Sequence, residues 1–166
     1  VNIQGDEPLL KEEHLRAAVA LVRAGWEIGT CATPLAALEA RKDPNVVKVV
    51  RGRHGGALYF SRAGIPYRRD GKPDEEDLNS GAFLRHIGIY AYRRASLLRW
   101  VDLPPSPLER LEMLEQLRPL EAGMGIGVAV VDAADPGVDT PADAVVMERR
   151  LKELGLDTLN EVSGAR

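Results

Sequence analysis

The first eight residues, Val1-Asn2-Ile3-Gln4-Gly5-Asp6-Glu7-Pro8, decide how the rest of the chain is interpreted. Residues 1–4 have the pattern of a short strand, with Val1-Asn2-Ile3 typical of the end of a buried strand, and residues 5–8 have the composition of a turn. A helix is predicted to follow from about Lys11 to Ala24, because Gly25 is a typical helix stop. A strand, a turn and a helix in this order begin a βαβ-like alternation.

The later elements continue this alternation. Strands are expected at residues 28–32, 46–50, 57–60, 83–92 and 126–131, and helices at residues 34–40, 106–120 and 140–155. Ser106 and Thr140 each precede a proline and stand three residues before an acid, which is the capping pattern of a helix start. Residues 66–81 are polar and contain Pro and Gly, so a surface loop is expected there. The glycines of residues 51–56 suit a hairpin connection between two antiparallel strands.

These elements predict one three-layer α/β domain with a mixed sheet. It covers residues 1–155 and carries an inserted β-rich portion at about 46–92, and residues 156–166 are expected to form a loose tail.

The bulk composition limits the class of protein. The 166 residues are 45% hydrophobic and 28% charged, which suits one soluble domain with a buried core. A net charge of -3 argues against binding to nucleic acid or to an anionic membrane. The single cysteine, Cys31, cannot form an internal disulfide, and no apolar run reaches the roughly 20 residues that span a bilayer. We therefore expect a cytoplasmic protein with neither a nucleic-acid nor a membrane partner.

Two acids stand where loops lead into helices. Asp6 follows the first strand, and Asp139 immediately precedes the capped helix that begins at Thr140. Ligands of open α/β sheets bind beyond the carboxyl ends of strands, and Mg²⁺ typically takes one or two carboxylates. Asp6 and Asp139 are therefore candidates for a shared magnesium site. From spacing alone, a role in capping a helix or complementing its dipole fits each acid at least as well.

One strand carries a candidate sugar-binding face. His86, Gly88 and Tyr90 alternate with Ile87 and Ile89, so the first three share one side of the strand. A histidine and a tyrosine on that side would suit hydrogen bonds to sugar hydroxyls, with the glycine leaving room for the ring. A strand that faces solvent gives the same alternation.

Three further polar residues are candidates for ligand contacts. The helix expected after Ser106 places Glu115 among leucines with Gln116 beside it, and either ligand hydroxyls or an ion pair with Arg118 would account for a carboxylate there. Arg62 could bind a carboxylate or phosphate, or be solvated. His14 and His54 are expected to be exposed, and no nucleophilic triad or Cys–His metal cluster is present in the sequence.

Five blocks of the sequence, in this order, resemble the 3-deoxy-manno-octulosonate (Kdo) cytidylyltransferases, also called CMP-Kdo synthetases. The blocks are Val1-Asn2-Ile3-Gln4-Gly5-Asp6-Glu7-Pro8, Ala57-Leu58-Tyr59-Phe60-Ser61-Arg62-Ala63, Phe83-Leu84-Arg85-His86-Ile87-Gly88-Ile89-Tyr90, Leu114-Glu115-Gln116-Leu117-Arg118 and Gly137-Val138-Asp139-Thr140-Pro141. The resemblance extends from Val1 to about Leu151.

The resemblance implies a nucleotidyltransferase-like (Rossmann-like) fold and an enzyme that converts CTP and Kdo into CMP-Kdo and pyrophosphate for bacterial lipopolysaccharide. It also implies that Asp6 and Asp139 hold catalytic Mg²⁺ and that Gln4 lies near the nucleotide. The sugar pocket is then expected to contain Arg62, His86, Tyr90, Glu115 and Gln116. The inserted β-rich portion is expected to contribute to a homodimer.

The family pattern includes N-terminal strands and a Gly-, Arg- and Lys-bearing loop that grips the CTP triphosphate. These elements are expected to be missing from the present sequence, which starts after them in that pattern. Two alternatives stay open: a synthetase for another acidic sugar, such as a sialic acid or amino-Kdo, and a non-catalytic remnant that keeps only the sugar pocket and dimer surface.

Overall fold

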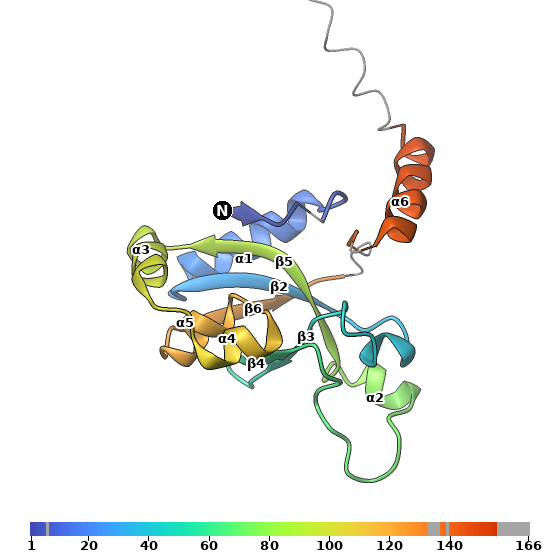
Figure 1. Cartoon of the computed structure of the whole chain (residues 1–166), viewed down its shortest axis with the longest axis horizontal. Coiled ribbons are helices and arrows are strands. Elements are labelled where there is room, and N and C mark those ends of the chain that lie inside the picture. The colour runs from blue at the N-terminus through green and yellow to red at the C-terminus, as the bar shows by residue number, and fades with distance from the viewer. Residues whose placement is uncertain (6, 133–136, 139, 156–166) are drawn as a thin grey trace, which may run out of the picture.

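The computed structural model describes residues 1–5, 7–132, 137–138 and 140–155, and Figure 1 shows how its elements are arranged. Six strands form one mixed sheet in the order β4-β3-β5-β2-β6, with β1 paired to β5 outside this path. The strands are β1 (Asn2–Ile3), β2 (Ile28–Pro34), β3 (Lys48–Arg51), β4 (Ala57–Ser61), β5 (Leu84–Tyr92) and β6 (Ile126–Val130). Among the strands that the structure describes, only β2 and β6 pair in parallel, and the other pairs are antiparallel.

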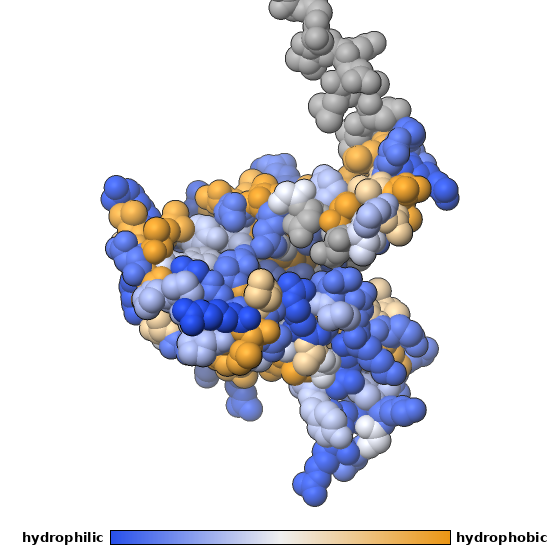
Figure 2. All heavy atoms as spheres, in the orientation of Figure 1, coloured by the Kyte–Doolittle hydropathy of each residue, from blue (hydrophilic) through white to orange (hydrophobic). Residues whose placement is uncertain are grey.

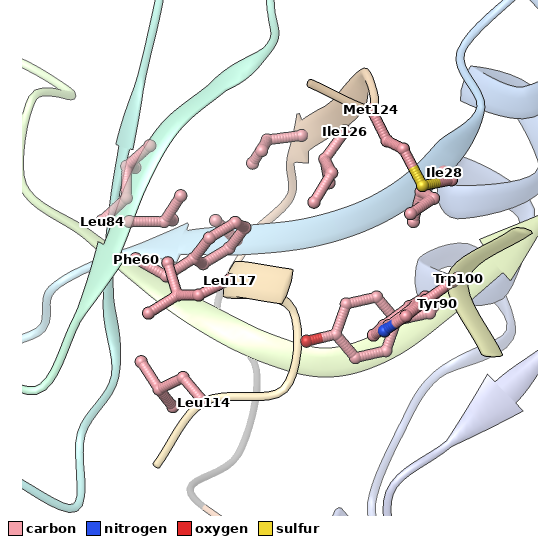
Figure 3. Packing of buried hydrophobic residues seen from close by; sticks show 12 residues of the cluster. Ile28, Phe60, Leu84, Tyr90, Trp100, Leu114, Leu117, Met124 and Ile126 are labelled. Carbon is pink, nitrogen blue, oxygen red and sulfur yellow. The ribbon is translucent and has the colours of Figure 1, made fainter. Parts of the chain in front are cut away.

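Helices cover both faces of the sheet. On one face, α1 (Glu12–Arg23) packs over Cys31, Ile87 and Ile89, which are buried with Ala18 of the helix. The other face is covered by α3 (Arg94–Asp102), α4 (Pro107–Glu112) and α5 (Leu117–Glu121). Figure 3 shows the larger hydrophobic cluster on that face, which includes Trp100, Leu114 and Leu117. The predicted three-layer arrangement is therefore confirmed.

The long central strand β5 has two edges with different neighbours. Along one edge, β2 pairs with it from Leu84 to Tyr92. The other edge is shared: β3 pairs with Leu84 and Arg85, and β1 pairs with Ile89 and Tyr90. The end of β1 and the start of β3 therefore meet opposite residues 86–88, where the paired edge divides.

The β3–β4 hairpin confirms the predicted antiparallel pair, and its turn closes with a 2.8 Å hydrogen bond from Gly52 N to Gly56 O. The tip also contacts β6, since Val128 N donates to Gly55 O at 2.8 Å. Gly56 bridges Gly127, and a Cβ on Gly127 would lie 2.7 Å from the Trp26 ring. The β3–β4 hairpin is thus fixed at two places, because β3 pairs with β5 and the hairpin tip contacts β6.

Several predicted elements differ from the structure. The helix expected at residues 34–40 is wrong: Pro34 ends β2 opposite Leu84, and only a 3-10 turn follows at Glu39–Arg41. Proline is tolerated at that strand end because the next amide, Leu35 N, continues the ladder to Phe83 O at 3.0 Å. The loop at 66–81 contains the short helix α2 (Glu75–Asn79), and α3 was not predicted.

The first strand was predicted to be buried, and this part of the prediction is wrong. Val1 is 66% exposed and Ile3 is 49% exposed. Within the described residues β1 pairs along one edge only, with β5.

The last helix, α6 (Pro141–Glu153), begins as predicted. Thr140 Oγ1 accepts a hydrogen bond from Asp143 N at 3.2 Å, and Asp143 Oδ2 accepts one from Thr140 N at 2.8 Å. The predicted tail, residues 156–166, lies outside the described residues. Among the residues that are described, no helix has both the length and the apolar character needed to cross a membrane.

Candidate functional site

A polar cleft of about 300 Å³ opens where β1 and β3 meet along β5. Figure 2 shows that the surface is hollowed between α6 and the body of the sheet, with mostly hydrophilic side chains beside the hollow. Five of the predicted site residues line this cleft: Gln4, Arg62, His86, Glu115 and Gln116. They come from β5, the segments after β1 and β4, and the α4–α5 connection, so the fold brings together residues that are far apart in the sequence.

His86 is nearly buried, and its environment keeps the imidazole neutral. Burial, followed by the positive charge of Arg85, lowers the pKa of His86 to about 3. Its Nε2 lies 2.9 Å from Thr30 Oγ1, and that hydroxyl donates to Ile89 O at 2.7 Å. Because the hydroxyl has one proton and gives it to Ile89, Nε2 must be the donor to Thr30. Nδ1 is then unprotonated and can accept a hydrogen bond from a ligand hydroxyl.

Gln4 enters the cleft through a gap that only glycine leaves open. A Cβ at Gly88 would lie 2.1 Å from Gln4 Oε1, so Gly88 makes room for this side chain rather than for a sugar ring as expected. Gln4 N donates to Gly88 O at 2.9 Å, and Gln4 Nε2 donates to Glu115 Oε1, also at 2.9 Å. Gln4 is therefore fixed at both its backbone and its side chain.

The α4–α5 connection presents Glu115 and Gln116 differently from the prediction. The expected continuous helix is interrupted at Met113, whose φ of 53° is left-handed. This turn leaves Glu115 exposed, instead of among leucines, and buries Gln116 to 2% exposure. Arg118 pairs with Glu109 at 2.5 Å instead of with Glu115. The Glu115 carboxylate is thus held by Gln4 at the cleft surface.

Arg62 is firmly positioned rather than solvated. Its guanidinium donates to three main-chain carbonyls, those of Pro44 at 2.9 Å, Glu112 at 2.8 Å and Met113 at 3.3 Å. The Glu112 carboxylate in turn accepts from Arg62 N at 2.9 Å and from Ser61 Oγ at 2.6 Å. Guanidinium has five N–H groups, so these three bonds leave two donors for a ligand.

Tyr90 does not reach the open cleft. It is 1% exposed, packs in the large hydrophobic cluster, and its ring centroid lies 5.4 Å from that of His86. Figure 3 shows its hydroxyl pointing away from Trp100, toward the turn between Leu114 and Leu117. Burial, with the negative charge of Glu115, raises the pKa of Tyr90. Its hydroxyl oxygen is buried without a hydrogen-bond partner among the described residues.

The alternative that this strand faces solvent is wrong, since helices cover both sides of β5. His14, expected to be exposed, is also fully buried, and Cys31 Sγ donates to its carbonyl at 3.2 Å. His54 is exposed as expected.

Several cleft residues escaped the sequence interpretation, among them Asp43, Asn45 and Arg85. Asp43 and Asn45 read as ordinary turn residues, and strand alternation places Arg85 on the opposite face from His86. Arg85 nevertheless lines the cleft, next to residues 86–88 where the paired edge of β5 divides. Together with Arg62 it adds a second cationic side chain to a lining otherwise rich in amides and carboxylates. This lining suits a ligand that has many hydroxyl groups and an acidic group.

The two predicted metal ligands, Asp6 and Asp139, lie outside the described residues. Their described neighbours in the chain, Glu7, Gly137 and Thr140, line the same cleft as His86. Across the residues that are described, no group of three or more His, Cys, Asp and Glu side chains could hold a metal ion. The described lining offers carboxylate oxygens and contains no cysteine, and oxygen ligands of this kind suit Mg²⁺.

The chain is an α/β domain with a mixed sheet, and its polar cleft lies where β1 and β3 meet along β5. We therefore class it as a ligand-binding α/β domain. The profile of the Cytidylyltransferase family matches residues 1–126, and the chain belongs to this family.

Several relatives are named 3-deoxy-manno-octulosonate cytidylyltransferase, as the sequence resemblance predicted. The protein from Syntrophotalea carbinolica is 50% identical over 158 residues, covering 93% of this chain and 63% of the relative. The protein from Halorhodospira halophila is 48% identical over 161 residues, covering 92% and 61%. This chain therefore spans about three fifths of the length of these relatives.

A solved structure shows the same fold. It is described as CMP:2-keto-3-deoxy-manno-octonic acid synthetase complexed with CTP, and it is 35% identical to this chain with a TM-score of 0.80. The match covers 92% of this chain and 61% of that structure. The predicted nucleotidyltransferase-like fold is confirmed by this similarity.

Proposed function

We propose that this chain forms the acceptor-sugar part of a CTP:Kdo cytidylyltransferase of the bacterial cytoplasm, which makes CMP-Kdo for lipopolysaccharide. The observation that carries the proposal is the convergence of Gln4, Arg62, His86, Glu115 and Gln116 on one cleft. The names of the relatives, at about half identity, give the sugar and the nucleotide.

In the proposed reaction, the anomeric hydroxyl of Kdo attacks the α-phosphorus of CTP. A bond forms between the sugar oxygen and phosphorus, the bond to the pyrophosphate oxygen breaks, and the hydroxyl proton is lost to solvent. No covalent enzyme intermediate is needed, so the protein acts mainly by positioning two anionic substrates. Arg62 and Arg85 offset the negative charge of the sugar carboxylate, while neutral His86 and Gln116 orient hydroxyl groups.

Mg²⁺ is the proposed cofactor, and Asp6 and Asp139 are its proposed ligands. When bound, the ion supplies charge neutralisation at the phosphates and lowers the pKa of a bound hydroxyl. The location of Glu7, Gly137 and Thr140 beside one cleft supports this assignment, because each is within two residues of one of the acids.

The family resemblance implies a loop that grips the triphosphate, and this chain spans about three fifths of the length of its relatives. The test therefore joins the chain to the corresponding N-terminal residues of the Syntrophotalea carbinolica relative and measures pyrophosphate release from CTP and Kdo with Mg²⁺. Asp6→Asn and Asp139→Asn are expected to abolish release, whereas Asp102→Asn, at an exposed carboxylate at the end of α3, should leave it unchanged. Unchanged turnover in both site variants would reject the metal assignment.

Measuring kcat/KM with several acidic sugars decides which of them is the acceptor. Kdo is expected to be preferred over a sialic acid and over amino-Kdo, and a higher kcat/KM for either of the others would replace the proposed acceptor. Calorimetric titration of the 166-residue chain with CTP addresses the non-catalytic remnant. Tight Mg²⁺-dependent binding would exclude that alternative.

The proposed assembly is a homodimer formed through residues 46–92. Two observations support it: β4 lies at the end of the sheet, and Leu58 and Tyr67 are 64% and 83% exposed. Sedimentation of the wild-type chain should give the mass of a dimer, and Leu58→Glu should shift it to a monomer. A monomeric wild type would reject this part of the proposal.

A further inference from the structure

Lys48, the first residue of β3, has a fully buried side chain whose charge the mechanism above does not use. Its Nζ donates to three main-chain oxygens: Asp43 O at 2.8 Å, Val46 O at 2.5 Å and Arg62 O at 2.5 Å. An ammonium group has three N–H donors, so each donor has one acceptor. Burying a charge is costly unless it is hydrogen-bonded in this way.

The three acceptors belong to two separate walls of the cleft. Asp43 and Val46 lie in the loop before β3, and Arg62 follows β4; all three residues line the cleft. One ammonium group therefore ties the loop wall to the β4 wall.

The same walls are connected to other parts of the site. Val47 O, in the loop, accepts from His86 N at 2.9 Å, and the Arg62 guanidinium donates to Pro44 O at 2.9 Å. Displacing the loop would therefore disturb both His86 and Arg62. Within the described residues, Lys48 joins the carbonyls of Val46 and Arg62, and it acts together with the Arg62–Pro44 bond in fixing one wall relative to the other.

We propose that Lys48 is a positioning residue for the sugar cleft: its ammonium group holds the 43–47 loop and Arg62 in the arrangement that binds the acidic sugar. The identity of the ligand rests on the proposed function, whereas the ordering of the two walls does not.

Charge is required for this role because a neutral amine has only two N–H groups. Burial lowers the pKa of Lys48 to about 8; nearby Asp43 and Glu112 oppose this shift, and Arg62 and Arg41 add to it. Above that pH one of the three carbonyls loses its donor. Sugar affinity is therefore expected to fall as the pH rises through about 8.

The effect on stability has the opposite sign. The folded-state pKa lies below the ordinary lysine value of 10.5, so the unfolded state holds this proton more tightly. Between about pH 8 and 10.5 the loss of the proton from Lys48 favours the folded state. A decline in sugar affinity in this range would thus not reflect unfolding caused by Lys48.

The test titrates Kdo calorimetrically into the 166-residue chain between pH 6.5 and 9.5. We expect the Kd of the wild type to rise about tenfold across this range. Lys48→Met should raise Kd about tenfold at pH 6.5 and remove the pH dependence, and Lys48→Arg, which stays charged, should also give a flat profile. Lys42→Met, at an exposed lysine just before the same loop, should behave as the wild type.

Hydrogen exchange measured without ligand tests the role of Lys48 independently of the proposed function. Corrected for the intrinsic effect of pH, the hydrogen-bonded amides of Asn45 and Arg62 should lose protection between pH 7 and 9.5 in the wild type and should be unprotected at both values in Lys48→Met. If the wild type binds no Kdo, the proposed function fails and exchange alone decides the role of Lys48. Equal protection and an equal pH profile in wild type and Lys48→Met would overturn the proposed role of Lys48. Thermal unfolding confirms that each variant is folded.

Discussion

Gln4 donates a 2.9 Å hydrogen bond to the carboxylate of Glu115, although 111 positions separate the two residues in the sequence. This bond joins the end of β1 to the connection between α4 and α5. The hydrogen bond is possible because Gly88 lets the Gln4 side chain approach β5 closely. Through this bond, the end of β1 and the α4–α5 connection meet at the cleft.

A methyl group at residue 88 should break this arrangement. In Gly88→Ala the Cβ would lie 2.1 Å from Gln4 Oε1 and 3.1 Å from Gln4 Cβ, so Gln4 must move. We expect a loss of about 1–3 kcal/mol in the free energy of unfolding, measured by urea denaturation, together with a raised KM for Kdo in the chimeric enzyme.

Gly5→Ala is the matched control for stability, because a Cβ there meets no atom within 4 Å. Its unfolding free energy should stay within about 0.5 kcal/mol of the wild type. An equally small change in Gly88→Ala would show that Gln4 is not held as the structure indicates.

Glu112 fixes the segment that carries Arg62. Its carboxylate accepts from Ser61 Oγ at 2.6 Å and from Arg62 N at 2.9 Å, and it is half-buried. Glu112→Ala leaves these donors without their acceptor and should cost about 1–3 kcal/mol of unfolding free energy. Glu121→Ala, at an exposed glutamate that ends α5, should cost less than about 0.5 kcal/mol. Similar values for the two variants would contradict this role.

The sequence predicted the strands and the helix caps well because those signals are local. Ser106 and Thr140 carry their capping partners three residues away, and both caps form as predicted. By contrast, the residue that precedes α3, Arg93, makes no side-chain capping bond, so the start of this helix has no such signal. Pro34 is a strand residue because of its pairing with Leu84, which sequence spacing does not show.

The site was predictable where the family blocks could be matched and unpredictable where distant segments meet. His86 and Gln116, which were expected in one sugar pocket, line the same cleft, and Gln4, which was expected near the nucleotide, lines it too. The roles of Lys48 and Arg62 depend on carbonyl groups from three separate segments, and carbonyls are present at every residue. Their use as acceptors can be known only once the chain is folded.

The fall in the free energy of unfolding at acid pH should depend on the buried side chain of His86. Burial lowers the pKa of His86 from 6.5 to about 3, so the unfolded state binds this proton more readily. The stability that neutral His86 contributes is complete above about pH 6.5 and is lost as the pH falls toward 3. In urea denaturation between pH 7 and 4, His86→Gln should therefore show a shallower loss of unfolding free energy than the wild type. His54→Gln, which alters an exposed histidine, should keep the wild-type slope, and parallel curves for wild type and His86→Gln would refute the assignment.

Met113 is a position at which a substitution is expected to stabilise the folded protein. It adopts φ 53° and ψ 49° with a side chain that is 73% exposed, so the left-handed backbone is strained while its side chain contributes little burial. Met113→Gly removes that strain and should raise the free energy of unfolding by up to about 1 kcal/mol. Met113→Val should lower it by a similar amount, since a β-branched residue is least tolerant of this conformation. Thermal unfolding of the three proteins checks the order Gly, Met, Val; the reverse order would mean that the α4–α5 connection does not adopt this turn in solution.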